Sequence, residues 1–184
     1  KSGHSVIMMP NADTYLNYYQ EDPEYAPIGS GSFLPIEQVY SYEPIPAQMN
    51  DRDKKYVLGM EAALWTPYMK NPDVVDYYMY PRFYAVAEVA WTPAEAKNYT
   101  DFLARIRKQY ARLDLQQVKA CRNYFDAYID GAFNKRTRKF EVRITGMIPG
   151  SEIRYTTDGH IPTLASNVYS NPIVLHKNTT IKAA

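Results

Sequence analysis

One pair of neighbouring segments limits the possible folds of this chain more than any other feature. The run from Tyr56 to Trp65 is mostly apolar without strict alternation, which is typical of a parallel strand covered on both faces. The segment 80–93 that follows is expected to be a helix. Together they predict a strand that ends in an aromatic residue and then a helix, as in the last β/α unit of a barrel.

A second strand is predicted earlier in the chain. The short apolar segment 4–9 is followed by a loop, 10–17, that carries the phenol of Tyr15 and the amide of Asn17. In α/β barrels, functional residues project from the carboxyl ends of the strands. The sequence therefore predicts that Tyr15, Asn17 and Trp65 lie on one rim, although position alone leaves open that Trp65 is only a core residue.

Several blocks in a fixed order suggest a family. The chain resembles the C-terminal part of glycoside hydrolase family 20, the β-N-acetylhexosaminidases of the chitobiase type. The blocks that carry the resemblance are 6–10 with 15–17, 31–40 with Pro44, 59–66, Pro81-Arg82 and 87–92, and they cover most of residues 4–124. The resemblance implies that residues 1–134 are the C-terminal portion of a (β/α)8 TIM barrel.

The resemblance also implies an activity. Family members remove terminal β-linked N-acetylglucosamine or N-acetylgalactosamine with retention, and the substrate's own acetamide oxygen is the nucleophile. In the family a paired Asp-Glu orients the acetamide and moves the proton. No Asp-Glu dipeptide occurs in these 184 residues. We therefore expect the chain to be a piece of a longer enzyme whose front half is absent, and to be inactive alone.

Three site residues follow from the resemblance. Tyr15 matches the tyrosine whose hydroxyl donates to the acetamide carbonyl and stabilises the oxazolinium-like intermediate. Trp65 matches the tryptophan that walls the subsite of the terminal sugar. Asn17 stands where most members have an aspartate that binds sugar hydroxyls. The expected ligand is thus a terminal N-acetylhexosamine of a glycan or glycoconjugate, and no cofactor is implied.

Two positions depart from the family pattern. Asn17 replaces the usual Asp, and Pro67 replaces a Glu; both acids normally bind the hydroxyls at C4 and C6. The side chain of Pro67 cannot accept or donate a hydrogen bond. The amide of Asn17 removes repulsion toward an anion and adds donors, and members that accept 6-sulfated N-acetylglucosamine carry an Asn in this motif. The hypothesis is that a C6 sulfate is tolerated.

Other polar residues favour structural roles. Arg82 and Glu88 match positions that form scaffold ion pairs in the family. Glu61 lies in the predicted buried strand, where an ion-pair partner is favoured over a site residue. Cys121, the single cysteine, is expected in the core. The three histidines, far apart in sequence, give no support to a metal site: His4, His160 and His176.

Helices are predicted after the barrel unit. The segment 92–95 is a capping-box signature with Pro93 at the first helical position, so a helix should begin there. Its apolar face recurs at helical spacing through Phe102, Leu103, Ile106, Tyr110 and Leu113. A further helical stretch is predicted from Val118 to Ile129.

The composition changes after a basic segment, 134–139, that we interpret as a linker. Residues 140–145 and 152–157 alternate with period two around Pro149-Gly150, which predicts a hairpin, and 173–175 and 180–182 add short strands. Residues 135–184 resemble part of the immunoglobulin-like domain that follows chitobiase-type barrels, a truncated β-sandwich. The predicted fold class is therefore α/β plus all-β. This second part either packs on the barrel, which we favour, or contacts glycans.

The composition limits the classes of partner that this chain can bind. A net charge of +1 with interspersed acids argues against nucleic acid, and no run is long enough to cross a membrane. The family resemblance suggests a periplasmic, cell-surface or secreted protein; the oligomeric state is unknown from the sequence. Two alternatives stay open: a non-catalytic glycan-binding or scaffold protein on a hexosaminidase-like framework, and an exo-glycosidase that releases a disaccharide.

Overall fold

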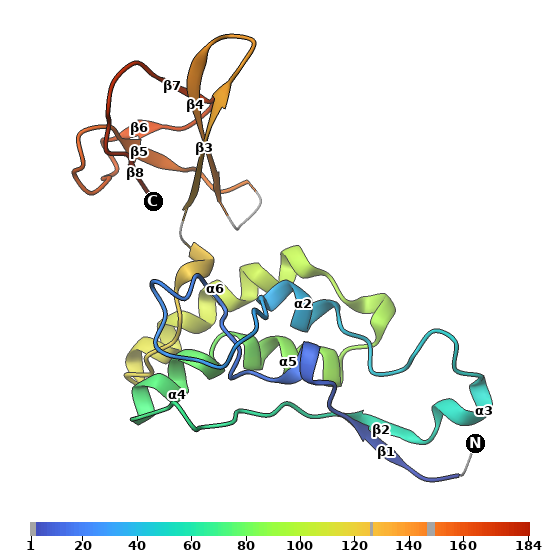
Figure 1. Cartoon of the computed structure of the whole chain (residues 1–184). Helices are drawn as coiled ribbons and strands as arrows, with labels where there is room; N and C mark the ends of the chain where they lie inside the picture. The colour runs from blue at the N-terminus through green and yellow to red at the C-terminus, as the bar shows by residue number, and fades with distance from the viewer. Residues whose placement is uncertain (1–2, 126, 147–149) are drawn as a thin grey trace. The chain divides into compact units, whose positions relative to one another are not determined.

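The chain divides into two compact units. The computed structural model describes residues 3–125, 127–146 and 150–184 (Figure 1). The boundary between the two units falls after Cys121. The sequence predicts a boundary between 134 and 135 instead. The difference arises because the residues before 135 belong to a strand of the second unit.

The first unit combines a parallel strand pair with helices. Its elements are β1 (Val6–Met8), α1 (Asn11–Thr14), α2 (Ile36–Ser41), α3 (Asp51–Lys54), β2 (Val57–Met60), α4 (Pro72–Met79), α5 (Arg82–Trp91), a 3-10 turn (Ala94–Ala96) and α6 (Tyr99–Leu115). Strand β1 pairs with β2 in parallel, as the sequence predicts, with Met8 opposite Met60. The order of strand, helix and parallel strand is that of an α/β fold.

The two strands are less buried than predicted. Val6 is 42% exposed, Ile7 is 56% exposed and Leu58 is 66% exposed. The prediction assumed neighbours on both faces, whereas each of these strands pairs only with the other in the described part of the chain. Glu61 follows β2 and is also exposed, so the prediction of a buried carboxylate there is wrong.

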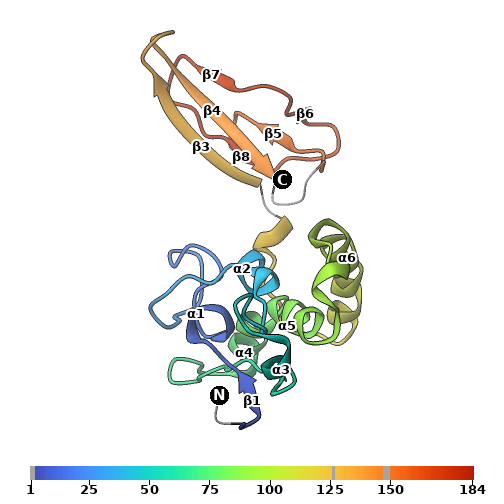
Figure 2. The ribbon, with the colours of Figure 1, turned by 90° about the vertical axis from the view of Figure 1, so that its right-hand side faces the viewer.

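The core of the first unit lies among its helices. Helix α2 packs against α5, and both views place them side by side (Figures 1 and 2). Side chains from these helices, from α4 and α6 and from the segment before α2 are almost fully buried, among them Leu34, Ile36, Val39, Tyr78, Ala85, Phe102, Ile106 and Leu113. Cys121, 1% exposed, is a core residue as predicted.

Helix α6 begins later than the capping-box signature predicts. Residues Ala94–Ala96 form a 3-10 turn, and α6 starts after Asn98, whose side chain accepts a hydrogen bond from the Asp101 N–H at 3.0 Å. Asn98 is thus the N-cap that satisfies a free donor of the first turn. The predicted apolar face is confirmed, because Phe102, Leu103, Ile106, Tyr110 and Leu113 are all buried.

The second unit is built from strands. A 3-10 turn (Asn123–Phe125) precedes β3 (Ala127–Asn134), β4 (Lys139–Gly146), β5 (Arg154–Thr156), β6 (Asn167–Val168), β7 (Ile173–Leu175) and β8 (Lys182–Ala183). They form two three-stranded sheets, ordered β3-β4-β7 and β6-β5-β8. Its buried residues include Val142 and Ile144, which lie on one face of β4.

Two sequence predictions for this unit are wrong. The helix expected over Val118–Ile129 does not form: residues 118–122 have no regular secondary structure, Asn123–Phe125 form a 3-10 turn, and β3 begins at Ala127. Strand β3 pairs along its whole length with β4, so the expected linker 134–139 contains the turn of that hairpin. The hairpin expected between 140–145 and 152–157 does not form, since β4 pairs with β3 and β7 and β5 pairs with β6 and β8. Pro149 of the expected turn lies outside the described residues.

Candidate functional site

The ends of β1 and β2 bring the predicted site residues together. Beyond the strands the parallel pairing resumes between Tyr15 and Ala63. The Leu16 N–H donates to the Ala63 carbonyl at 2.8 Å, and the Ala63 N–H donates to the Thr14 carbonyl at 3.0 Å. This register sets Trp65 two residues past the partner of Tyr15, so both rings lie beyond the carboxyl ends of the strands.

Tyr15 and Trp65 are in direct contact. Their ring centroids are 5.9 Å apart with the planes at 65°, an edge-to-face geometry that aromatic pairs favour. Tyr18 also contacts Tyr15, with the two ring centroids 5.9 Å apart. Trp65 is 52% exposed, so the pair combines a supported ring with an indole surface open to a ligand. An exposed indole face can pack against the apolar face of a sugar.

Asn17 differs from the other two residues in being buried. It is 4% exposed, and its amide oxygen Oδ1 is enclosed without a hydrogen-bond partner among the described residues. The main-chain carbonyl of Asn17 accepts from the Ser30 N–H at 3.0 Å. In this conformation the side chain of Asn17 therefore lies beneath the surface of the loop that carries Tyr15.

Glu88 forms the structural ion pair that the sequence predicts. Its carboxylate accepts from the Arg105 guanidinium at 2.6 and 3.0 Å, which ties α5 to α6. Hydrogen bonds to Glu88 and then to Asp101 raise the pKa of Arg105. This pair is a bidentate bridge between helices and has no connection to the Tyr15–Trp65 contact.

Arg82 has a role that sequence reasoning missed. Its side chain is fully buried, and its guanidinium donates to main-chain carbonyls that include those of Leu16 and Tyr18, on both sides of Asn17. Arginine spacing in the sequence gives no hint of these partners. The available signal is an arginine at the start of a mostly apolar helix, since a cation in such a place needs buried acceptors.

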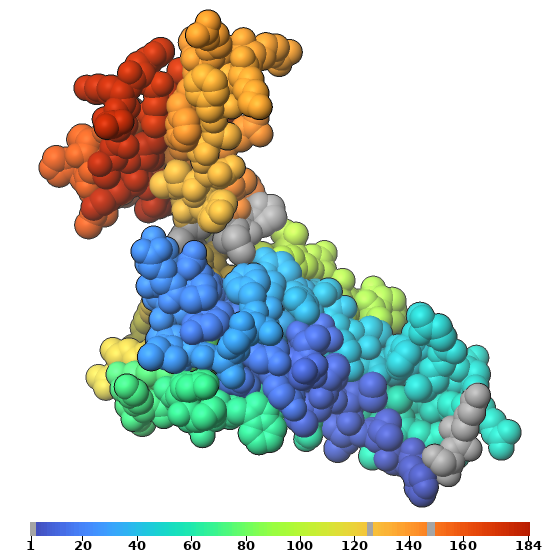
Figure 3. Space-filling view, viewed as in Figure 1, coloured from blue at the N-terminus to red at the C-terminus, as the bar shows by residue number. Residues whose placement is uncertain are grey.

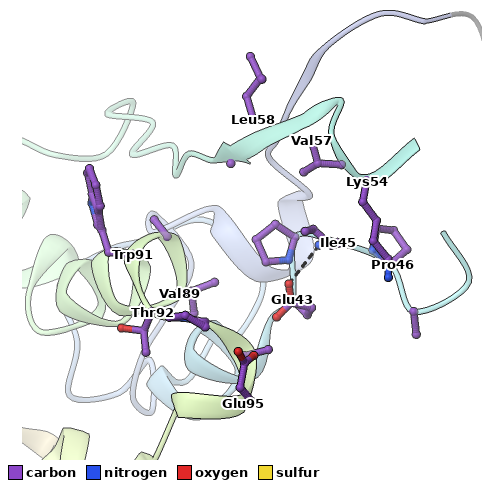
Figure 4. Close-up of a pocket in the computed structure, with 16 residues that line it drawn as sticks. Glu43, Ile45, Pro46, Lys54, Val57, Leu58, Val89, Trp91, Thr92 and Glu95 are labelled. Atoms are coloured by element: carbon purple, nitrogen blue, oxygen red, sulfur yellow. Dashed lines mark hydrogen bonds between the residues drawn. The ribbon is translucent and has the colours of Figure 1, made fainter. Parts of the chain in front are cut away.

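A cavity lies near β2 but away from the aromatic pair. It has a volume of 630 Å³, and its lining includes Glu43, Lys54, Val57, Val89 and Trp91 (Figure 4). Leu58 points away from the other labelled side chains (Figure 4). Neither Tyr15 nor Trp65 lines this cavity, so we assign the candidate site to the exposed aromatic pair instead.

Metal ligands and membrane spans are not found in the described parts of the chain. Residues 3–125, 127–146 and 150–184 hold no group of three or more His, Cys, Asp or Glu side chains placed to share a metal ion. His160 contacts Asp158 at 3.2 Å on the surface. Among the described helices, none combines the length and apolar character needed to cross a bilayer.

The chain is similar to known proteins along most of its length. It is 35% identical to a β-hexosaminidase of Porphyromonas gingivalis over 97% of this chain, which corresponds to 23% of that relative. The crystal structure of an exo β-N-acetylglucosaminidase from Vibrio harveyi in complex with N-acetylglucosamine matches 65% of this chain and 19% of its own length, with 36% identity and a TM-score of 0.56. A β-N-acetylhexosaminidase structure from Streptomyces coelicolor matches 65% of this chain and 24% of its own length, with 26% identity and a TM-score of 0.58.

Two family models match separate parts of the chain. Residues 142–184 match the model described as Fn3 associated. Residues 1–94, which include both rings of the aromatic pair, match the model of the glycosyl hydrolase family 20 catalytic domain. The chain spans less than a quarter of the length of the Porphyromonas gingivalis relative. On the strength of the match over residues 1–94 and of the identity to the Porphyromonas gingivalis protein, this chain belongs to glycosyl hydrolase family 20.

Proposed function

We propose that this chain forms part of an exo-acting β-N-acetylhexosaminidase that removes terminal β-linked N-acetylglucosamine or N-acetylgalactosamine. The observation that carries the proposal is the Tyr15–Trp65 contact beyond the ends of the paired strands. It supplies a phenol and an exposed indole side by side, and the family match covers both residues. The similar Vibrio harveyi enzyme was solved with N-acetylglucosamine bound.

In the proposed reaction, the acetamide carbonyl oxygen of the substrate attacks C1 as the glycosidic bond breaks. The leaving oxygen takes a proton from the general acid. Water then adds to C1 from the side of the departed group as the bond between C1 and the acetamide oxygen breaks, and the resulting carboxylate takes the proton of the water, which gives retention. The Tyr15 hydroxyl donates to the acetamide oxygen and holds it under C1. The Trp65 indole packs on the sugar and excludes water.

The chain works within a longer catalytic domain in this proposal. The Asp-Glu pair that the family uses as general acid and orienting group is absent from the sequence, and the relatives are more than four times as long as the part that matches. Exposed apolar residues on β1 and β2, Val6, Ile7 and Leu58, support packing against further elements of a barrel. Alone, the chain should not turn over substrate.

Sugar selectivity in this proposal depends on two positions. Pro67 is exposed and offers no polar side-chain atom to the hydroxyls at C4 and C6. Asn17 is neutral and therefore does not repel an anion at C6. Tolerance of a 6-sulfate is the substrate preference that we infer from this pair of replacements.

The proposal also covers the fold of the second unit and the cellular location of the protein. We assign residues 122–184 to a partial β-sandwich, supported by its two three-stranded sheets and by the Fn3-associated match. Because the proposed substrates are glycans and glycoconjugates, we infer a periplasmic, cell-surface or secreted protein. The loss of a polar contact at Pro67 favours one alternative function, a non-catalytic glycan-binding protein on the same framework.

The experiment that tests the proposal uses the complete reading frame that contains this chain. Release of the aryl group from an aryl N-acetyl-β-glucosaminide is measured with and without a 6-sulfate, together with the products from chito-oligosaccharides. Release of single N-acetylhexosamine units supports the proposal, and release of a disaccharide supports the other exo-glycosidase. Folded protein that binds these glycans without cleaving them would instead establish the glycan-binding function.

A further inference from the structure

Arg82 is a fully buried cation at the start of α5. One terminal nitrogen of its guanidinium donates to the carbonyls of Tyr18 at 3.0 Å and Leu34 at 2.9 Å. The other donates to the carbonyl of Tyr78 at 2.8 Å and to that of Leu16. A single planar group thus joins the C-terminal end of α4, the segment before α2 and the loop after Tyr15.

Two of these acceptors, Leu16 and Tyr18, flank Asn17, and Leu16 follows Tyr15 directly. Fixing the carbonyls of Leu16 and Tyr18 fixes the planes of the peptide groups that follow them, because the peptide unit is rigid. The Leu16 N–H is held at the same time by Ala63, at 2.8 Å. The backbone on both sides of Asn17 is therefore bound, and the direction in which the Tyr15 side chain leaves the chain depends on these bonds.

Further along the chain, the same loop is bound by side chains and carbonyls of the neighbouring helix α4. The Gln20 amide donates to the Tyr77 carbonyl, and the Tyr77 hydroxyl donates to Glu21. The Tyr78 hydroxyl donates to the Pro27 carbonyl at 2.5 Å. In the space-filling view the blue atoms of the N-terminal loops lie directly over the green atoms of the α4 region (Figure 3). Helix α4 thus binds residues 20–27 through hydrogen bonds, whereas Arg82 binds the residues next to Tyr15.

We propose that Arg82 is a positioning residue that sets the conformation of residues 15–18 and, through it, the place of the Tyr15 hydroxyl. The catalytic part of this inference rests on the proposed function; the conformational part does not. Lysine cannot replace Arg82 in this role. The four carbonyl acceptors are bound by two terminal nitrogens of the guanidinium, and the single ammonium nitrogen of a lysine cannot span them. Arg105 offers a matched control, since it is bound by carboxylates of α5 and α6 and touches no carbonyl of the loop in the hydrogen bonds described above.

The activity test is a double-mutant cycle in the complete reading frame. Arg82→Lys should lower kcat about 10- to 100-fold, the cost of a misplaced catalytic group, with a smaller change in KM. In a Tyr15→Phe background the same change should lower kcat far less, because the hydroxyl that Arg82 places is already gone. Arg105→Lys should leave kcat unchanged in both backgrounds. Equal losses from Arg82→Lys in both backgrounds would assign Arg82 to stability alone and overturn the proposal.

A second measurement separates this inference from the proposed function. Amide hydrogen exchange of the 184-residue chain is followed by NMR at Leu16 and Tyr19, whose N–H groups donate to Ala63 and Ser32 at 2.8 Å each. Arg82→Lys should speed exchange there at least about tenfold relative to α6, and Arg105→Lys should not. Faster exchange in Arg82→Lys, combined with no turnover by the complete reading frame, would refute only the proposed function. Unchanged exchange in Arg82→Lys would refute the positioning role. The role would also be refuted if both Arg82→Lys and Arg82→Gln lost cooperative melting while Arg105→Lys still folded.

Discussion

The Tyr15 ring meets the Trp65 indole edge to face, with their centroids 5.9 Å apart. Tyr15 comes from the loop after β1, and Trp65 from the segment after β2, so the contact depends on the parallel register of the two strands. Each ring limits the motion of the other. The pair can therefore hold a hydroxyl group and an apolar platform in a constant relation, which a catalytic sugar subsite requires.

Removing the Tyr15 hydroxyl should affect catalysis more than binding. Tyr15→Phe keeps the ring contact with Trp65 but removes the donor, so kcat should fall about 100- to 1,000-fold while KM changes little. Trp65→Ala should mainly raise KM, because the platform is lost. Tyr25→Phe is the control, since that tyrosine is 75% exposed. Steady-state kinetics of the complete reading frame on an aryl N-acetyl-β-glucosaminide decide the matter, and a wild-type kcat in Tyr15→Phe would exclude the role.

A charge at position 17 should select against the sulfated substrate. Asn17→Asp places a carboxylate where the neutral amide now lies, and its repulsion should lower kcat/KM for 6-sulfated substrate more than for the unsubstituted one. The measurement is the ratio of the two kcat/KM values. Asn11→Asp, at an exposed amide of α1, should leave the ratio unchanged. A ratio that improves in Asn17→Asp would rule out tolerance of the sulfate through this residue.

Alkaline pH should weaken folding through Tyr77. Burial, followed by the hydrogen bond to Glu21, raises the pKa of Tyr77 above its ordinary value. As the pH rises, the unfolded chain therefore loses the phenolic proton before the folded chain does. The contribution of Tyr77 to the free energy of unfolding is complete below about pH 10 and is lost as the pH rises above that value.

The check is the urea midpoint between about pH 8 and pH 11. Tyr77→Phe should be less stable than the parent chain by about 1 kcal/mol at the lower pH, because a hydrogen bond is lost, and its stability should fall less steeply as the pH rises. Tyr68→Phe, at a tyrosine that is 51% exposed, should keep the parent slope. Parallel slopes for Tyr77→Phe and the parent chain would contradict the assignment.

A side chain at position 29 should loosen the loop that follows the site. A Cβ built on Gly29 would meet the hydroxyl of Tyr78, lie 2.8 Å from its Cζ and lie 3.2 Å from the Asn17 carbonyl oxygen. Tyr78 is fully buried and cannot move aside, so Gly29→Ala should cost about 1 to 3 kcal/mol of stability. Calorimetric melting measures the loss. Removing the hydroxyl in Gly29→Ala/Tyr78→Phe should recover part of it, and strictly additive losses would show that the overlap is not the cause.

The elements that the sequence predicts well are those whose pattern is local. The buried face of α6 agrees with prediction because apolar spacing along the helix determines it. The parallel pairing of β1 and β2, and with it the contact between Tyr15 and Trp65, agrees with the expectation from the resemblance to a barrel, since apolar spacing alone does not determine which strands pair. The burial of Asn17 is not predictable from local pattern, since its surroundings are set by contacts made across the loop, such as the bond from the Ser30 N–H to its carbonyl.

The predictions fail where partners distant in sequence decide the conformation. The segment Val118–Ile129 has helical spacing, yet Ala127 to Ile129 pair with Ile144 to Gly146 in a sheet. Strand pairing with residues beyond a turn overrides a weak local preference. Likewise, β5 pairs with β6 and β8, which no alternation within residues 140–157 could reveal. The carbonyl partners of Arg82 are invisible to sequence reasoning because main-chain acceptors carry no residue type.

The hydrogen bonds of Arg82 also impose an order on biosynthesis. Its acceptors at Leu16, Tyr18 and Leu34 precede it by 66, 64 and 48 residues. At a synthesis rate of about 5 to 20 residues per second, the ribosome needs roughly 3 to 13 seconds to pass from the first acceptor to the arginine. During that interval the loop that bears Tyr15 has its carbonyl groups in place but not the cation that binds them. The hydrogen bonds that fix the loop thus form only after a residue translated later is available. The loop can adopt its final conformation only once α5 has left the ribosome.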